Sequence, residues 1–252
     1  MKNYSFYLSI FFLFCFSFSQ NVQAQETDEI NNWFFLHTTA KLNSKWKLGN
    51  EFHIRRDDWV ENWRNLLERP YVTYSVNKHF SATVGYTYIG SWALPGSDKA
   101  PHSNEHNIWE QVSFHHKLNK AIKVSHRYRF EHRFVDQWEH NLATDEWSKT
   151  DNVFRNRFRY RMTIKSKLFN FGDNQDIYLH IFDEIWVNQA DNLRFKGLGR
   201  NWLYLGLGYD LNPQLCFELA YMQQHDSYNT TDYLNTPIMQ LSIGYKVPVK
   251  KS

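Results

Sequence analysis

Cysteine is scarce in this chain of 252 residues, and only Cys216 remains beyond the N-terminal segment. A single cysteine cannot form an internal disulfide, and no pair of cysteines has the spacing of a metal site. Long apolar runs are also missing, because no later segment approaches the roughly 18 apolar residues of a transmembrane helix. The net charge of +3 is too small to indicate a nucleic-acid partner, so we expect none.

The N-terminal segment has the three parts of a secretory signal peptide. Lys2 supplies the positive start, residues 6–18 form a short apolar stretch, and Val22 and Ala24 are the small residues of a cleavage site. The apolar stretch is too short for a comfortable transmembrane helix. We therefore predict a signal peptide over residues 1–24, which leaves one exported domain over residues 25–252.

The composition combines many aromatic residues with low mean hydropathy. Aromatic residues make up 18% of the chain, yet its mean hydropathy is −0.64. A soluble protein with so many rings would bury them in a core and would be less polar elsewhere. A membrane β-barrel needs apolar groups only on its outer face, together with aromatic girdles and a polar lumen. The composition is therefore typical of an outer-membrane barrel.

Apolar and polar residues alternate with period two in most of the chain, which predicts strands. In 122–134, Val124 and Phe130 fall on the face opposite Arg127 and Arg129, and residues 154–165 repeat the pattern. A strand places such a set on one side, whereas a helix would scatter it. Clear alternation is also found in 80–88, 202–209, 215–222 and 239–247, and weaker alternation in 33–42, 46–56, 64–76, 108–118 and 177–187.

The predicted strands are joined alternately by short and long connections. Short turns are predicted near Asn43-Ser44, Asn77-Lys78, Asn119-Lys120, Asp173-Asn174 and Asn212-Pro213. Longer polar loops are predicted near 57–63, 93–105, 136–151, 189–198 and 227–236. This layout predicts an all-β fold, an antiparallel up-and-down transmembrane β-barrel of ten to twelve strands, with short periplasmic turns and longer extracellular loops. Eleven segments are visible although such barrels usually have even strand numbers, so either one segment is misassigned or 136–151 contains a strand.

Several of these segments resemble a known family. They are Trp33, the segment from Trp46 to Arg55, Gly85-Tyr86, the arginine-rich strand and Gly206-Leu207-Gly208-Tyr209. Together they are similar to domain-of-unknown-function family 2490, a group of bacterial outer-membrane proteins. The resemblance covers nearly the whole exported chain and implies an outer-membrane barrel with no known reaction.

A basic wall of seven arginines is predicted on two neighbouring strands. It consists of Arg127, Arg129, Arg133, Arg155, Arg157, Arg159 and Arg161. Each would cost about 2–4 kcal/mol if it faced lipid at the bilayer midplane, so we expect the wall to face the lumen. An ion-pair network is the favoured interpretation, and an anion-attracting lining is the alternative. The candidate acidic partners are Glu51, Glu68, Glu131, Glu184 and Glu218.

Other constellations give weaker indications of chemistry. Ser113, His115 and His126 could belong to a lipid hydrolase, although no motif fixes a third catalytic member. His102 and His106 have a spacing that suits a metal only if their loop were helical. We therefore assign no catalytic residue, cofactor or metal ligand.

The sequence thus predicts an outer-membrane protein that is not an enzyme, either a structural barrel or a pore for small solutes. Expected partners are outer-membrane lipid, the barrel-assembly machinery and a small anionic solute. An outer-membrane lipid-modifying hydrolase and a soluble ligand-binding β-barrel remain alternatives.

Overall fold

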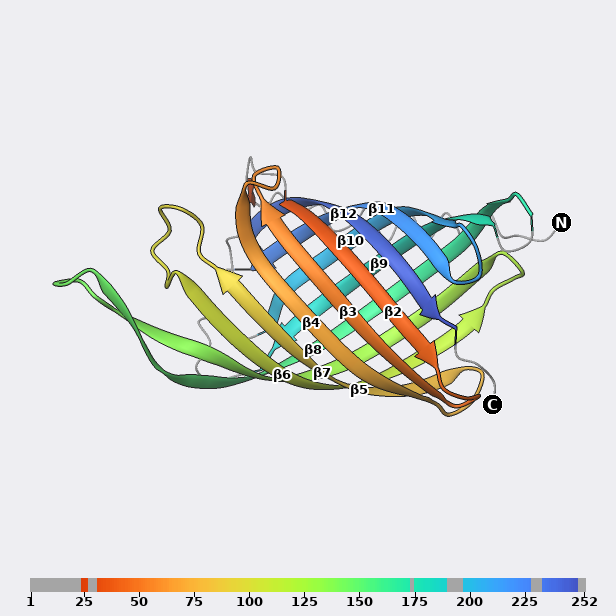
Figure 1. Cartoon of the computed structure of the whole chain (residues 1–252), viewed down its shortest axis with the longest axis horizontal. Helices are drawn as coiled ribbons and strands as arrows, with labels where there is room; N and C mark the ends of the chain where they lie inside the picture. The colour runs from red at the N-terminus through yellow and green to blue at the C-terminus, as the bar shows by residue number, and fades with distance from the viewer. Residues whose placement is uncertain (1–23, 27–30, 173–174, 190–196, 228–232, 249–252) are drawn as a thin grey trace.

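Twelve strands form a single sheet among the residues that the computed structural model describes, which are 24–26, 31–172, 175–189, 197–227 and 233–248. Neighbours from β2 to β12 pair antiparallel in chain order, so the chain runs up and down around a barrel (Figure 1). The strands are β1 (Ala24–Glu26), β2 (Asn31–Lys41), β3 (Trp46–Asp57), β4 (Asn62–Ser75), β5 (Phe80–Trp92), β6 (His102–Lys117), β7 (Ile122–Asn141), β8 (Glu146–Asn170), β9 (Asp176–Asn188), β10 (Gly197–Asp210), β11 (Leu215–Ser227) and β12 (Tyr233–Val247).

The barrel closes through a parallel seam between β12 and β2. Their pairing runs from Ile238 opposite Asn31 to Val247 opposite Ala40. Eleven strands, β2 to β12, make the wall, and each corresponds to one alternating segment of the sequence. In an up-and-down chain with an odd number of strands, the first and last strands run in the same direction, so closure must be parallel. The predicted all-β barrel of ten to twelve strands is confirmed, with eleven strands in place of an even number.

The short turns share one hydrogen-bonding pattern at one end of the barrel. In the β2–β3 turn, the Asn43 side-chain oxygen accepts hydrogen bonds from the backbone N–H groups of Lys45 and Trp46, at 2.9 and 2.8 Å. An asparagine that bonds its own backbone in this way stabilises a tight turn. The same pattern is formed by Asn77, Asn119 and Asn212. The predicted turn at Asp173-Asn174 lies outside the described residues.

The longest connection predicted from the sequence is mostly strand. β7 continues to Asn141 and β8 begins at Glu146, so the predicted loop 136–151 is the end of a hairpin that extends beyond the rest of the barrel (Figure 1). This part of the hairpin projects beyond the wall, so it needs no apolar outer face and is polar. Without an apolar face, its sequence lacks the alternation that identifies a strand. The predicted loop 93–105 is also shorter than expected, because β6 already begins at His102.

The two faces of the barrel wall differ in composition. On β10, Leu203, Leu205 and Leu207 point outward and are 52–54% exposed, whereas Trp202 and Tyr204 point inward and are buried. The same alternation recurs around the barrel, so large apolar side chains cover its outside and polar and aromatic ones fill its inside. Within the described ranges, no helix is long and apolar enough to cross a membrane.

Candidate functional site: the barrel lumen

The lumen contains a cavity of about 1120 Å³. Its lining extends from Asp98 and Trp147, beside the long connections, to Cys216 and Gly244, close to the short turns. Among the described residues that line it, twelve are Lys or Arg and seven are Asp or Glu. Glu131 and Glu184 lie buried behind these residues and reduce the excess of positive charge without removing it. The side chains therefore leave free space inside the barrel, and the walls of that space are net positive.

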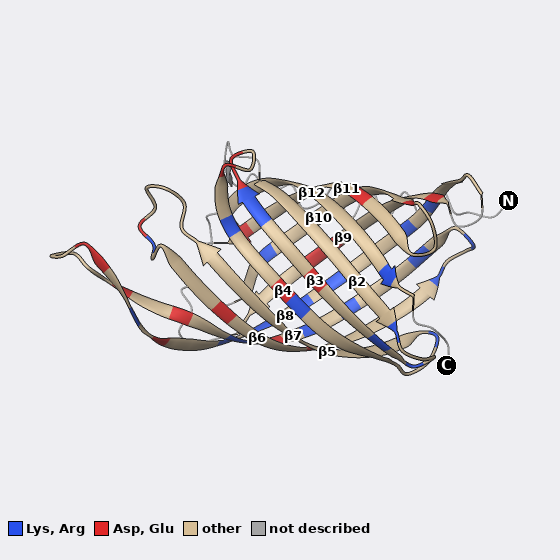
Figure 2. Ribbon diagram, viewed as in Figure 1, with Lys and Arg blue, Asp and Glu red and all other residues tan. Residues whose placement is uncertain are grey.

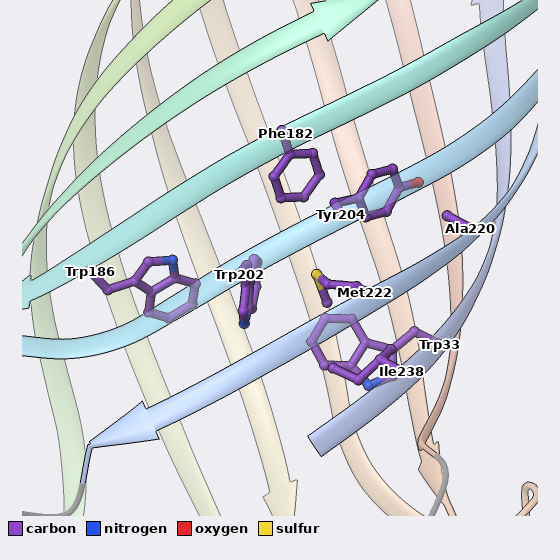
Figure 3. Close-up of a cluster of buried hydrophobic side chains, with 8 residues drawn as sticks. All are labelled: Trp33, Phe182, Trp186, Trp202, Tyr204, Ala220, Met222 and Ile238. Atoms are coloured by element: carbon purple, nitrogen blue, oxygen red, sulfur yellow. The ribbon is translucent and has the colours of Figure 1, made fainter. Parts of the chain in front are cut away.

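One side of the lumen is aromatic (Figure 3). Phe182 stacks on Tyr204 at 4.4 Å between ring centroids, and Trp202 packs against Trp186 at 4.5 Å and Trp33 at 5.5 Å. These rings form a buried cluster that spans β9 to β12 and β2. Its members are Trp33, Phe182, Trp186, Trp202, Tyr204, Ala220, Met222 and Ile238.

The seven arginines of the basic wall all lie on the inner face of β7 and β8. Six of them line the cavity, and Arg129 is buried against the wall. The register places Arg129 directly opposite Arg159, and Arg127 opposite Arg161. Figure 2 shows charged positions close together on neighbouring strands around the middle of the barrel. Like charges opposite one another are destabilising, so this arrangement requires acidic side chains between them.

Two fully buried glutamates supply that charge. Arg159 Nη1 donates to Glu131 at 2.8 Å and Arg159 Nε donates to Glu184, also at 2.8 Å. Arg157 Nε donates to the second oxygen of Glu131 at 2.6 Å. Glu184 also accepts from Arg127 and Arg161. Five arginines of the wall, counting the 3.9 Å approach of Arg129 to Glu131, thus share two carboxylates.

The remaining ion pairs extend this network to other strands. Arg69 donates to Glu51 at 2.7 Å, and Arg133 donates to both oxygens of Glu105 at 2.7 and 2.6 Å. Arg200 pairs with Asp226. Sequence reasoning missed Arg69, Glu105, Arg200 and Asp226 as members. Glu105 was placed in a loop, although it continues the alternation of the inward-facing Asn107 and Trp109 on β6.

Two of the candidate acidic partners differ from expectation. Glu218 is inward but accepts from His180 at 2.8 Å and from the Tyr204 hydroxyl at 2.5 Å, and its contact to Lys165 is 3.9 Å. Glu68 is exposed on the outer face, since its neighbours Leu67 and Arg69 point inward. The proposal that Glu68 pairs with the basic wall is therefore wrong.

Aromatic rings hold several of the guanidinium groups. Arg159 lies over Trp186 at 3.9 Å, Arg161 over Phe182 at 3.7 Å and Arg129 over Trp109 at 3.9 Å. A cation over the face of a ring is attracted by the ring quadrupole, and Arg leaves its N–H edge free when stacked in this way. The rings thus fix the orientation of the arginines in addition to their carboxylate partners.

Inward-facing glycines give three large rings room to lie along the wall. A Cβ on Gly85 would fall 2.3 Å from the Trp109 ring, and a Cβ on Gly208 would fall 2.1 Å from the Tyr178 ring. Tyr71 covers Gly49 in the same way. A ring that lies against the backbone of its neighbour does not cross the lumen, so these glycines favour an open interior.

The structure does not bring the other candidate residues together. Ser113 faces the lumen and accepts a hydrogen bond from Gln111 at 3.1 Å, whereas His126 lies on the opposite face and contacts the Tyr160 hydroxyl at 2.9 Å. His102 and His106 sit on strand β6, not on a helix. Among the described residues there is no group of three or more His, Cys, Asp or Glu that could hold a metal.

Comparison with known proteins identifies a family and a similar solved structure. A solved structure described as the NanC porin is similar at 10% sequence identity and a TM-score of 0.49, covering 87% of this chain and 99% of that one. No curated protein matches. The family model described as "Protein of unknown function (DUF2490)" matches residues 30–235. The chain therefore belongs to the DUF2490 family.

Proposed function

We propose that this protein is an outer-membrane β-barrel that gives small anionic solutes a path lined by arginines. The observation that carries the proposal is the cavity of about 1120 Å³, whose described lining has twelve basic and seven acidic residues. A pore wall with an excess of fixed positive charge raises the local concentration of anions and lowers that of cations.

The outer face supports a membrane location. Large apolar side chains such as Val84 on β5, Leu205 on β10 and Leu219 on β11 are 52–61% exposed, so apolar residues cover separate parts of the outer wall. Monomeric soluble proteins rarely expose contiguous apolar patches of more than a few hundred Å². The outward apolar belt is therefore better explained by contact with lipid than by a soluble ligand-binding barrel. Export through the predicted signal peptide belongs to the same proposal.

The ion-pair network has a structural role within this function. Glu131 and Glu184 neutralise part of the charge of five closely spaced arginines, and this reduces the repulsion between β7 and β8. Arg155, by contrast, lines the cavity with its Nε unbonded among the described residues. The basic wall thus combines an ion-pair network with an anion-attracting lining. Its paired arginines stabilise the barrel, and further arginines face the open space.

Planar-bilayer recording of the purified, refolded protein tests the proposal. Under a KCl gradient, we expect a conductance whose reversal potential shows preference for chloride. Arg155→Glu should shift the reversal potential toward potassium, while Lys120→Glu, in the short β6–β7 turn, should change it much less. A folded barrel that conducts nothing would overturn the pore and leave a purely structural barrel. Release of fatty acid from outer-membrane lipid would favour the hydrolase.

A further inference from the structure

Arg55 is a buried cation in the lumen without an acidic partner among the described residues. Its side chain lines the cavity, the residue is only 8% exposed, and its Nε has no hydrogen-bond partner. Burying a charge is costly unless it is paired and hydrogen-bonded. A buried arginine that lacks an acidic partner in the barrel wall indicates that its partner comes from outside the wall.

The charges that act on Arg55 most strongly are also positive. The ionisable groups that act on it most strongly are four other arginines, namely Arg200, Arg69, Arg159 and Arg157. Each of those four is already paired with a carboxylate: Arg200 with Asp226, Arg69 with Glu51, and Arg157 and Arg159 with Glu131, which they share, while Arg159 also pairs with Glu184. Their acids are occupied, so the region around Arg55 carries uncompensated positive charge.

Trp33 holds Arg55 in a defined orientation. The two residues are direct register partners on β2 and β3, and the guanidinium lies 3.6 Å from the ring centroid, with Trp202 at 5.9 Å. Stacking uses the flat face of the guanidinium and leaves its N–H groups at the edge. Those N–H groups form a fixed fork that matches the two oxygens of a carboxylate or phosphate.

We propose that the cavity in front of Arg55 is a binding site for one oxyanion group, a carboxylate, phosphate or sulfate, which passes through or rests in the lumen. Arg55 donates through its N–H edge, and the surrounding arginines add attraction without giving up their own carboxylates. The site deepens the proposed function by naming the chemistry of the solute, and it rests on that function only because the solute must reach the lumen from water.

Binding of inorganic phosphate to the detergent-folded protein tests the site without any conductance measurement. Equilibrium dialysis in a chloride buffer of constant ionic strength should detect one phosphate per chain, and thermal unfolding should shift upward with phosphate concentration. Arg55→Gln should weaken binding about tenfold or more, because a charge-assisted pair of hydrogen bonds is lost. Arg56→Gln, at the next position of β3, is the matched control and should retain binding within a few fold, because Arg56 donates to the backbone carbonyls of Val60 and Glu61 and does not line the cavity.

A second measurement separates this role from a structural one. Without phosphate, Arg55→Gln should be at least as stable as the wild type, because it removes an unpaired buried charge, and phosphate should no longer raise its unfolding temperature. Equal phosphate binding by wild type and Arg55→Gln, or an "adventitious ion only" pattern in which chloride competes as well as sulfate does, would overturn the site. Arg55-dependent phosphate binding in a barrel that conducts nothing would leave the site standing while the proposed pore failed.

Discussion

Arg159 joins two fully buried glutamates, with its Nη1 and its Nε each 2.8 Å from an oxygen of Glu131 and Glu184 respectively. This one side chain links three strands, since Glu131 lies on β7, Arg159 on β8 and Glu184 on β9. Buried ion pairs contribute little net stability compared with apolar packing, but losing one partner leaves a charge that is both buried and unpaired.

We therefore expect Arg159→Met to lower the free energy of unfolding by about 3–5 kcal/mol. Urea unfolding of the refolded barrel, followed by tryptophan fluorescence, measures the change. Arg155→Met is the matched control on the same strand, because Arg155 is half-exposed and its Nε has no hydrogen-bond partner among the described residues. Adding Glu131→Gln to Arg159→Met should recover part of the loss. Equal stability of the two single variants would contradict the network.

Gly85 is expected to be intolerant of even one added carbon. Its Cβ would fall 2.3 Å from the Trp109 ring, which is itself held by Thr87 and Arg129. Gly85→Ala should cost about 1–3 kcal/mol through overpacking and change the near-ultraviolet circular dichroism of the tryptophans. Gly90→Ala on the same strand is the control, since the nearest atom to its Cβ would be 3.4 Å away. A neutral Gly85→Ala would show that the ring is free to move.

The two faces of the wall can be separated at adjacent positions of β12. Gln240 lines the cavity, whereas Leu241 is 43% exposed on the outside. In a Cys216→Ser background, we expect cysteine at 240 to react with a water-soluble thiol reagent and cysteine at 241 to react with a lipid-soluble one. The protein should be labelled in liposomes. The reverse pattern would place the arginines in lipid and would invalidate the lumen argument.

The parallel seam can be tested by cross-linking. Phe34 and Leu241 are outward-facing register partners across β2 and β12. Cysteines at both positions, without Cys216, should form a disulfide on mild oxidation and change migration of the folded protein on a gel. The control pair of cysteines at 34 and 245 is displaced by four residues, about 13 Å along the strand, and should not cross-link. Equal cross-linking of both pairs would mean that the register is wrong.

Strand positions could be predicted because each barrel strand carries its own local signal. The alternation of arginine with Phe154, Phe158 and Tyr160 depends only on the period of a strand, and the asparagine turns depend only on local hydrogen bonds. The face of Glu68 was harder to predict, because Leu66 and Leu67 are adjacent apolar residues on opposite faces of β4, and only Leu67 lines the cavity. Alternation around Glu68 therefore does not identify which face of β4 is the inner one.

Partner choice within the lumen could not be predicted, because it depends on which strands lie side by side at closure. Trp33 and Arg55 are partners on the neighbouring strands β2 and β3, but they meet Trp202 on β10 only when the β12–β2 seam forms. Likewise, Glu218 is hydrogen-bonded to Tyr204 and His180, and it forms no ion pair with an arginine of the wall among the described residues. Alternation states which residues point inward but not their distances across the barrel.

Because the number of strands is odd, the first and last strands of the wall leave their free ends on opposite sides of the barrel. β2 begins at the end of the long connections and β12 finishes at the end of the short turns. In the proposed outer-membrane orientation, with the short turns in the periplasm, a peptide tag inserted directly before Asn31 would be exposed on the cell surface, and one placed directly after Val247 would lie beneath the membrane. A barrel with an even number of strands would show both tags to the same compartment, so this molecule would serve as a surface scaffold and a periplasmic anchor at once.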